Sequence, residues 1–79
     1  MMLEVKYFGM IAEELKLSSE EIELKKNSSV AFFKSELLKK YPALNKINFQ
    51  IAVDKEIVNN EFMITKDCEI AVLPPFAGG

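Results

Sequence analysis

The fold is decided by the stretch NSSVAFFKSELLKKYP, residues 27–42 of the chain. Its apolar residues recur at helical spacing and form one stripe, namely Val30, Phe33, Leu37, Leu38 and Tyr41. The side chains of residues 27–29 offer oxygens that can cap the first amides of a helix. Pro42 ends the helix, because proline has no amide hydrogen and clashes with the preceding turn. The stretch therefore predicts a helix from about Val30 to Tyr41 that packs through one face.

Alternating apolar and polar residues on both sides of this helix predict strands, because successive side chains of a strand point to opposite faces. The predicted strands are, in order, residues 2–8, 20–25, 49–53, 57–58 and 68–73. A short helix or turn is expected at Met10–Leu17, after a break at Gly9, and a loop is expected at residues 43–48.

This order of elements predicts an α+β fold. One main helix packed on one face of a mixed sheet of four or five strands would bury all the apolar stripes together. The β-grasp (ubiquitin-like) arrangement has this order, with the first and last strands side by side in the middle of the sheet. The chain has 79 residues, enough for one domain. We expect that domain to cover residues 1–73, followed by an extended, protruding tail at residues 74–79.

The composition excludes several kinds of function. The chain contains no His, Trp or Arg, and its 10 Lys and 12 acidic residues give a net charge of −2. It therefore lacks the commonest acid–base group and metal ligand, and the forked donor that clamps phosphates. No basic block suits a nucleic acid. We expect this chain to bind no metal or cofactor and not to be an enzyme by itself.

Membrane and redox signals are also weak. The longest apolar runs fall far short of the roughly 20 residues that a membrane helix needs. The first residues, MMLEVKYF, alternate with charges and do not resemble a signal peptide. The single cysteine, Cys68, shares a strand face with Ile70 and Val72, so we expect it to pack in the core and not to act as a sulfur nucleophile. A cytoplasmic protein without a membrane partner is expected.

The last six residues, PPFAGG, differ from the rest of the chain. Pro74 and Pro75 must end the last strand, since neither can donate to a sheet ladder, and together they hold the chain extended. Gly78 and Gly79 have no side chains and can pass a narrow channel. The reactive group would then be the main-chain carboxylate of Gly79. The alternative is a frayed terminus without a function.

This ending resembles a known family. LPPFAGG, residues 73–79, is similar to the apolar-Pro-Pro-x-Ala-Gly-Gly ending of molybdopterin synthase small subunits. Three further segments fall where that family has corresponding ones: VKYFGMIAEEL at residues 5–15, SSV at 28–30 and AVDKEIV at 52–58. A bare Gly-Gly is shared with ubiquitin-like modifiers and thiamine-pathway carriers. The Pro-Pro-x-Ala-Gly-Gly form is more specific.

The resemblance implies a sulfur carrier for molybdenum cofactor biosynthesis. A partner similar to ubiquitin-activating enzymes would use ATP to adenylate Gly79, and a sulfur donor would convert it to a thiocarboxylate. The large synthase subunit would then receive this end, and the sulfur would pass to cyclic pyranopterin monophosphate. Gly78 would fit the channel, and four tail residues would direct and seal the entry, namely Pro74, Pro75, Phe76 and Ala77. The family suggests a heterotetramer with two large subunits.

A partner-binding face can be predicted from the strand pattern. Phe8 and Leu73 fall on the outward, charged faces of their strands although both are large and apolar. If the two strands are neighbours, these side chains form an apolar surface patch, a common sign of an interface. The family positions that match these two and Ile57 contact the activating enzyme and the large subunit. The alternative is that both are ordinary exposed apolar residues.

Three other functions remain open. One is a sulfur carrier for another product, such as the thiazole of thiamine or thiolated tRNA. The second is a protein modifier that forms isopeptide bonds through Gly79. The third is a binding-only ubiquitin-like domain, in which the Gly-Gly ending has no role. A thiocarboxylate on the isolated chain would favour the carriers, and conjugates to lysines of other proteins would favour the modifier.

Overall fold

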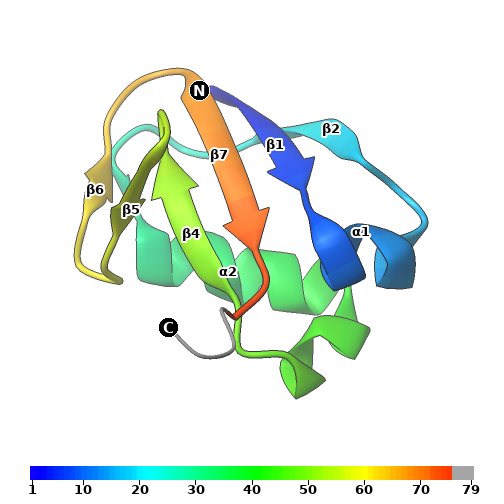
Figure 1. Ribbon diagram of the computed structural model, residues 1–79. Coiled ribbons are helices and arrows are strands. Elements are labelled where there is room, and N and C mark those ends of the chain that lie inside the picture. The colour runs from blue at the N-terminus through cyan, green and yellow to red at the C-terminus, as the bar shows by residue number, and fades with distance from the viewer. Residues whose placement is uncertain (76–79) are drawn as a thin grey trace.

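A mixed five-stranded sheet in the order β2-β1-β7-β4-β5 forms the centre of the molecule (Figure 1). The computed structural model describes residues 1–75, so the predictions on Phe76, Ala77, Gly78 and Gly79, and on how far the tail protrudes, lie outside the described residues. The elements are β1 (Met2–Tyr7), α1 (Gly9–Leu15), β2 (Ser19–Glu23), β3 (Ser28–Ser29), α2 (Val30–Lys40), the 3₁₀ helix η1 (Pro42–Lys46), β4 (Gln50–Val53), β5 (Glu56–Val58), β6 (Met63–Ile64) and β7 (Cys68–Leu73).

The first and last strands are parallel neighbours in the middle of the sheet, as the sequence predicts. Leu3, Val5 and Tyr7 lie opposite Cys68, Ile70 and Val72. Strand β2 pairs antiparallel with the other side of β1, and β4 pairs antiparallel with β7 and with β5. The prediction of an α+β, β-grasp fold with a mixed sheet is confirmed.

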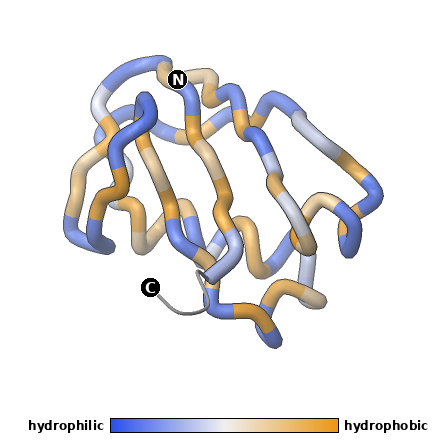
Figure 2. Tube along the Cα trace, viewed as in Figure 1, coloured by the Kyte–Doolittle hydropathy of each residue, from blue (hydrophilic) through white to orange (hydrophobic). Residues whose placement is uncertain are grey.

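Helix α2 crosses one face of the sheet and closes the core (Figure 1). Apolar residues recur along the central strands and along this helix, as the orange stretches of the tube show (Figure 2). The fully buried side chains come from both layers, with Leu3, Val5, Ile51, Ile70 and Val72 on the strands and Val30, Phe33 and Leu37 on the helix. Within residues 1–75, the opposite face of the sheet carries no helix (Figure 1).

Helix α2 begins as predicted but ends one residue early. The Ser29 side chain accepts a hydrogen bond from the amide of Phe32 at 3.0 Å, which caps the first turn. Tyr41 closes the helix with φ −130° and ψ 80° and is not part of it. The reason is Pro42, because a residue that precedes proline is driven out of the helical region.

Several short elements differ from the prediction. The loop expected at residues 43–48 is largely the 3₁₀ helix η1, which begins at Pro42 and buries Leu44 completely. Strands β3 and β6 form a separate two-stranded ladder that the pattern does not predict. Gly9, expected only to break the first strand, is the first residue of α1. That helix ends at Leu15 rather than Leu17, because Lys16 adopts the left-handed conformation.

The turn between β4 and β5 is a tight two-residue hairpin. Val53 pairs with Glu56, and the two residues between them, Asp54 and Lys55, have φ values of 47° and 73°. Two positive φ values at the central positions are those of a type I′ turn, which matches the twist of the flanking strands. This hairpin fixes Ile57 beside Ala52 on the sheet.

Candidate functional site

The tail leaves from the middle of the sheet. Strand β7, which lies between β1 and β4, ends at Leu73, and Pro74 and Pro75 follow it directly (Figure 1). The amide of Phe8, the residue after β1, donates to the carbonyl of Val72 at 3.3 Å and so holds β7 just before the prolines. The exit point of the tail is thus fixed by the two best-paired strands of the fold.

Gly9 lies directly against Pro74, the first proline of the tail. A Cβ atom at Gly9 would lie 3.3 Å from Cγ of Pro74, and Gly9 has a φ of +56°. Both facts favour glycine, since side chains rarely adopt this φ and would press on the proline. Sequence reasoning missed this role. The only signal in the sequence is a glycine directly after the predicted strand, and this pattern indicates no more than a break.

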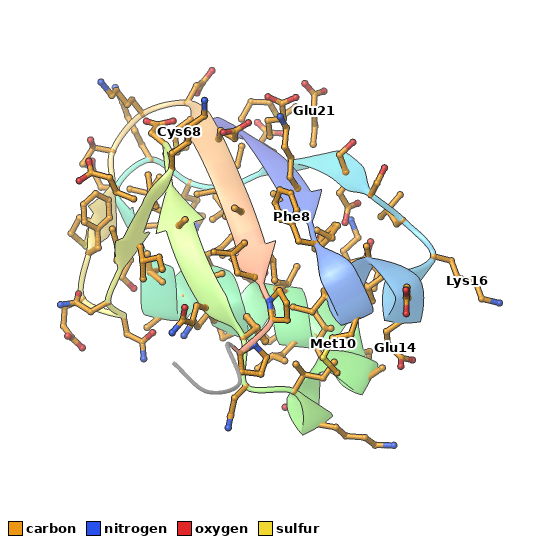
Figure 3. The ribbon with its side chains drawn as sticks, viewed as in Figure 1. Phe8, Met10, Glu14, Lys16, Glu21 and Cys68 are labelled. Carbon is orange, nitrogen blue, oxygen red and sulfur yellow. The ribbon has the colours of Figure 1, made fainter. Side chains whose placement is uncertain are left out.

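An apolar hollow lies beside the tail exit, on the face of the sheet without a helix. Its volume is about 370 Å³, and its apolar lining is Phe8, Ala52, Ile57, Ala71 and Leu73. Phe8 and Ile57 remain 43% and 58% exposed, which is high for large apolar side chains. Figure 3 shows Phe8 over this face of the sheet. The structure therefore brings together the three predicted partner-binding residues of the domain, and their role in binding stays a prediction.

Two alanines make this surface concave. Ala52 and Ala71 lie directly opposite each other on β4 and β7, and Ile57 on β5 lies opposite Ala52. Small side chains in the centre and large ones around them leave space for a side chain from another protein. The sequence did not point to these alanines, because an alanine in a strand carries no signal of its own.

Charged side chains border the hollow on one side. Nζ of Lys6 lies 2.7 Å from Oε2 of Glu69, and Lys55 also lines the hollow. The hydrogen bond to Glu69 raises the pKa of Lys6, with the charges of Glu69 and Glu4 acting in the same direction. Such an exposed pair adds little stability. A charged border around an apolar centre is the usual composition of a protein interface.

Cys68 lies partly buried at the edge of the core, against which it packs. Burial raises the pKa of its thiol, and the nearby carboxylates of Asp54 and Asp67 raise it further. The thiol is therefore protonated near neutral pH, which makes it a poor nucleophile. This agrees with the expected packing role.

Metal and membrane features are not found in the part of the chain described. Within residues 1–75, no group of three or more His, Cys, Asp or Glu side chains is placed to hold a metal ion. The helices in the same range are too short or too polar to cross a membrane.

The comparison with known families decides which group of proteins this is. A family model described as the ThiS family matches residues 5–79. The chain belongs to the ThiS family. A curated relative, the molybdopterin synthase sulfur carrier subunit of Caenorhabditis elegans, is 32% identical over 81 residues, covering 98% of this chain and 96% of that protein. The resemblance drawn from the LPPFAGG ending is thereby confirmed.

Solved structures share the fold of this ThiS-family chain. The putative molybdopterin converting factor subunit 1 of Pyrococcus furiosus has a TM-score of 0.85 at 22% identity, covering 95% of this chain and 98% of that one. SAMP1 of Haloferax volcanii, a small archaeal modifier protein, has a TM-score of 0.83 at 19% identity, covering 100% of both chains. Subunits 1 and 2 of the molybdopterin-converting factor of Helicobacter pylori were solved as a complex, in which the matching chain has a TM-score of 0.70 at 24% identity over 100% of both chains. At these identities the likeness shows the fold.

Proposed function

We propose that this chain is the sulfur-carrier small subunit of a molybdopterin synthase. The observation that carries the proposal is the full-length match to the C. elegans sulfur carrier subunit, which covers 98% of this chain and 96% of that protein. The Helicobacter pylori complex supports a large subunit as the principal partner. A heterotetramer with two large subunits, in the cytoplasm, completes the proposal.

The proposed chemistry takes place on the carboxylate of Gly79. A carboxylate is a poor electrophile, because an oxide would have to leave. In the first step the carboxylate oxygen attacks the α-phosphorus of ATP on an activating partner, and pyrophosphate leaves. A sulfur donor then displaces AMP and leaves a thiocarboxylate. The thiocarboxylate sulfur finally bonds to cyclic pyranopterin monophosphate, and water then cleaves the acyl carbon–sulfur bond, which leaves the sulfur on the pterin and restores the carboxylate for another cycle.

The composition of the chain and the position of the hollow both suit a protein whose partners carry out the chemistry. The chain contains no His and no Arg, so the proposal assigns acid–base and phosphate chemistry to the partners. The chain itself supplies a docking face and an acyl end. Leu73 lines the hollow and directly precedes Pro74, so a partner that covers the hollow also lies at the tail exit. Six extended residues span about 20 Å, enough to enter a neighbouring active site.

Intact-mass spectrometry tests the proposal. The chain is produced together with its activating partner and sulfur donor, and then with the large subunit and the pterin precursor. A product heavier by the difference between sulfur and oxygen is expected, and it should return to the original mass as the precursor is converted. Deletion of Gly79 is the matched control, which should abolish both changes without altering the melting temperature. A full-length chain that acquires no sulfur under these conditions would contradict the proposal.

A protein modifier is the second candidate, because it would use the same activated Gly79. The likeness to SAMP1 concerns the fold alone, so the choice depends on the nucleophile that the acyl-adenylate meets. A sulfur nucleophile gives a carrier, for molybdopterin or for thiamine or tRNA thiolation, and a lysine amine gives a conjugate. Isopeptide-linked conjugates in cells, without a thiocarboxylate, would favour the modifier. Conversion of the precursor by the purified synthase separates the carriers from one another.

A further inference from the structure

A second exposed apolar surface lies at the start of α2, beside β6. Phe32 and Met63 are 44% and 47% exposed and line a hollow of about 490 Å³ together with residues 25–29. We refer to Lys25, Lys26, Phe32 and Met63 as the Phe32 surface. The first turn of α2 and β6 both lie at the end of the molecule away from α1 (Figure 1). The hollow near the tail exit shares no residue with this surface.

The charge of the Phe32 surface is positive, although the whole chain carries a net charge of −2. Among residues 1–75, Lys25 and Lys26 are the only charged residues that line it. The ion pairs formed within residues 1–75 join Lys6 to Glu69, Lys39 to Glu36 and Lys40 to Glu20, so neither of these two lysines is neutralised by a described carboxylate. An acidic partner would complement them.

The backbone under the surface is held by hydrogen bonds and strand pairing before anything binds. Asn27 adopts a φ of 62°, and the hydroxyl of Ser28 donates to the carbonyl of Lys25 at 2.7 Å. The next residue, Ser29, caps α2 through Phe32 and pairs with Met63 in the β3–β6 ladder. A preformed surface loses little conformational entropy on binding, which favours affinity.

The start of α2 cannot itself bind an anion, because its amides are already used. The amide of Val30 donates to the carbonyl of Phe62 at 2.9 Å, and that of Ala31 donates to the carbonyl of Asn60 at 3.0 Å. The third, of Phe32, donates to Ser29. Recognition of a negative charge at this place therefore falls to the two lysines.

We propose that the Phe32 surface docks a protein segment in which a large apolar side chain is flanked by carboxylates. The apolar side chain would cover Phe32 and Met63, and the carboxylates would meet Lys25 and Lys26. The surface and the hollow share no residue, so this contact uses side chains that the hollow does not. This inference does not depend on sulfur transfer.

The test uses synthetic peptides and amide chemical-shift mapping on the full chain. The probe peptide has a central Leu-Phe pair flanked by aspartates. One matched peptide replaces the aspartates by lysines, and another replaces the Leu-Phe pair by serines. Saturable binding of the first peptide alone is expected, with shifts confined to residues 25–32 and to Met63, and with weaker binding at high salt.

Variants complete the test. The double substitution K25E/K26E should weaken binding of the acidic peptide by roughly tenfold or more and reverse its salt dependence, because attraction becomes a repulsion that salt screens. The matched control K16E/K46E makes the same change of charge at two exposed lysines that do not line this surface, and it should bind like the unaltered chain. Equal loss in both variants, no binding by the acidic peptide, or shifts centred on Phe8 and Leu73 would overturn the proposal. Selective binding to vesicles of anionic lipid, with no peptide binding, would overturn it in favour of a membrane.

Discussion

The rings of Tyr7 and Tyr41 meet edge to face, with their centroids 6.1 Å apart and their planes at 84°. Both hydroxyls donate to the carboxylate of Glu20, at 2.7 Å and 2.5 Å, and Lys40 donates to the same carboxylate at 2.8 Å. The cluster joins β1, β2 and the end of α2 through one side chain. Burial and the hydrogen bond to Glu20 raise the pKa of Tyr7 far above its usual value, so its hydroxyl stays a donor at any ordinary pH.

Glu20→Gln should destabilise the fold by about 1–2 kcal/mol at neutral pH, since hydrogen bonds to a charged acceptor are stronger than those to a neutral one. Burial alone would raise the pKa of Glu20, but hydrogen bonds from Lys40, Tyr41 and Tyr7 outweigh it and lower the pKa. The unfolded chain therefore binds the proton more readily. Glu20 therefore contributes to the free energy of unfolding above the pKa that it has in the unfolded chain, about 4.3. This contribution is lost as the pH falls through the lower pKa of Glu20 in the folded chain.

Urea unfolding at neutral and at acidic pH measures this effect. The difference in the free energy of unfolding between the original chain and Glu20→Gln should become smaller as the pH falls. Glu21→Gln is the control on the same strand, because Glu21 is exposed and lies opposite Glu4, a like charge. That variant should be neutral or slightly stabilising. A gap between the original chain and Glu20→Gln that is equal at both pH values would show that the charge of Glu20 is not involved.

Gly9→Ala should lower stability by roughly 1–2 kcal/mol, because an L side chain is strained in the left-handed region. Its Cβ would also press on Cγ of Pro74 from 3.3 Å, which should displace the start of the tail and slow its adenylation by the activating partner. Adding Pro74→Ala removes this contact and leaves the φ strain unchanged. The double variant should therefore recover tail adenylation in part while its melting temperature stays low. If the double variant regains both normal adenylation and the normal melting temperature, or regains neither, the contact does not direct the tail.

Charge introduced into the hollow should block docking. Phe8→Asp or Ile57→Asp is expected to weaken binding of the large subunit by roughly tenfold or more, because a carboxylate would be desolvated in an apolar contact. Calorimetry measures the affinity, and thermal unfolding should change little because both side chains are exposed. Met10→Asp is the control, since Met10 is 51% exposed on α1 and does not line the hollow. If Met10→Asp weakens binding of the large subunit equally, the effect of the carboxylate is not specific to the hollow.

Ala71→Leu should fill the hollow without unfolding the chain. Ala71 is half-buried on the face of the sheet that carries no helix, so a larger side chain has room to point outward. Stability should stay within about 0.5 kcal/mol, while affinity for the large subunit falls because the space for its side chain is gone. Ala71→Ser keeps the size and should bind almost normally. An Ala71→Leu variant with unchanged affinity would mean that the partner contacts only the residues around the hollow and places no side chain inside it.

Strong periodic patterns explain what the sequence predicts well. The central strands and α2 have apolar residues at clear spacings of two and of three to four, and the outward position of Phe8 and Leu73 follows from the same spacing. Strands β3 and β6 have two residues each and therefore show no period. The contact of Gly9 with Pro74 and the pairing of Ala52 with Ala71 arise only when segments distant in the chain meet, and no local pattern signals them.

The position of β7 has a mechanical consequence. A carrier whose end is gripped and withdrawn in every cycle transmits that pull to the strand from which the end emerges. Here that strand is hydrogen-bonded along both sides, to β1 in the parallel sense and to β4 in the antiparallel sense. A force along its axis loads the bonds on both sides in shear together, whereas an edge strand would carry the same force on the bonds of one side alone.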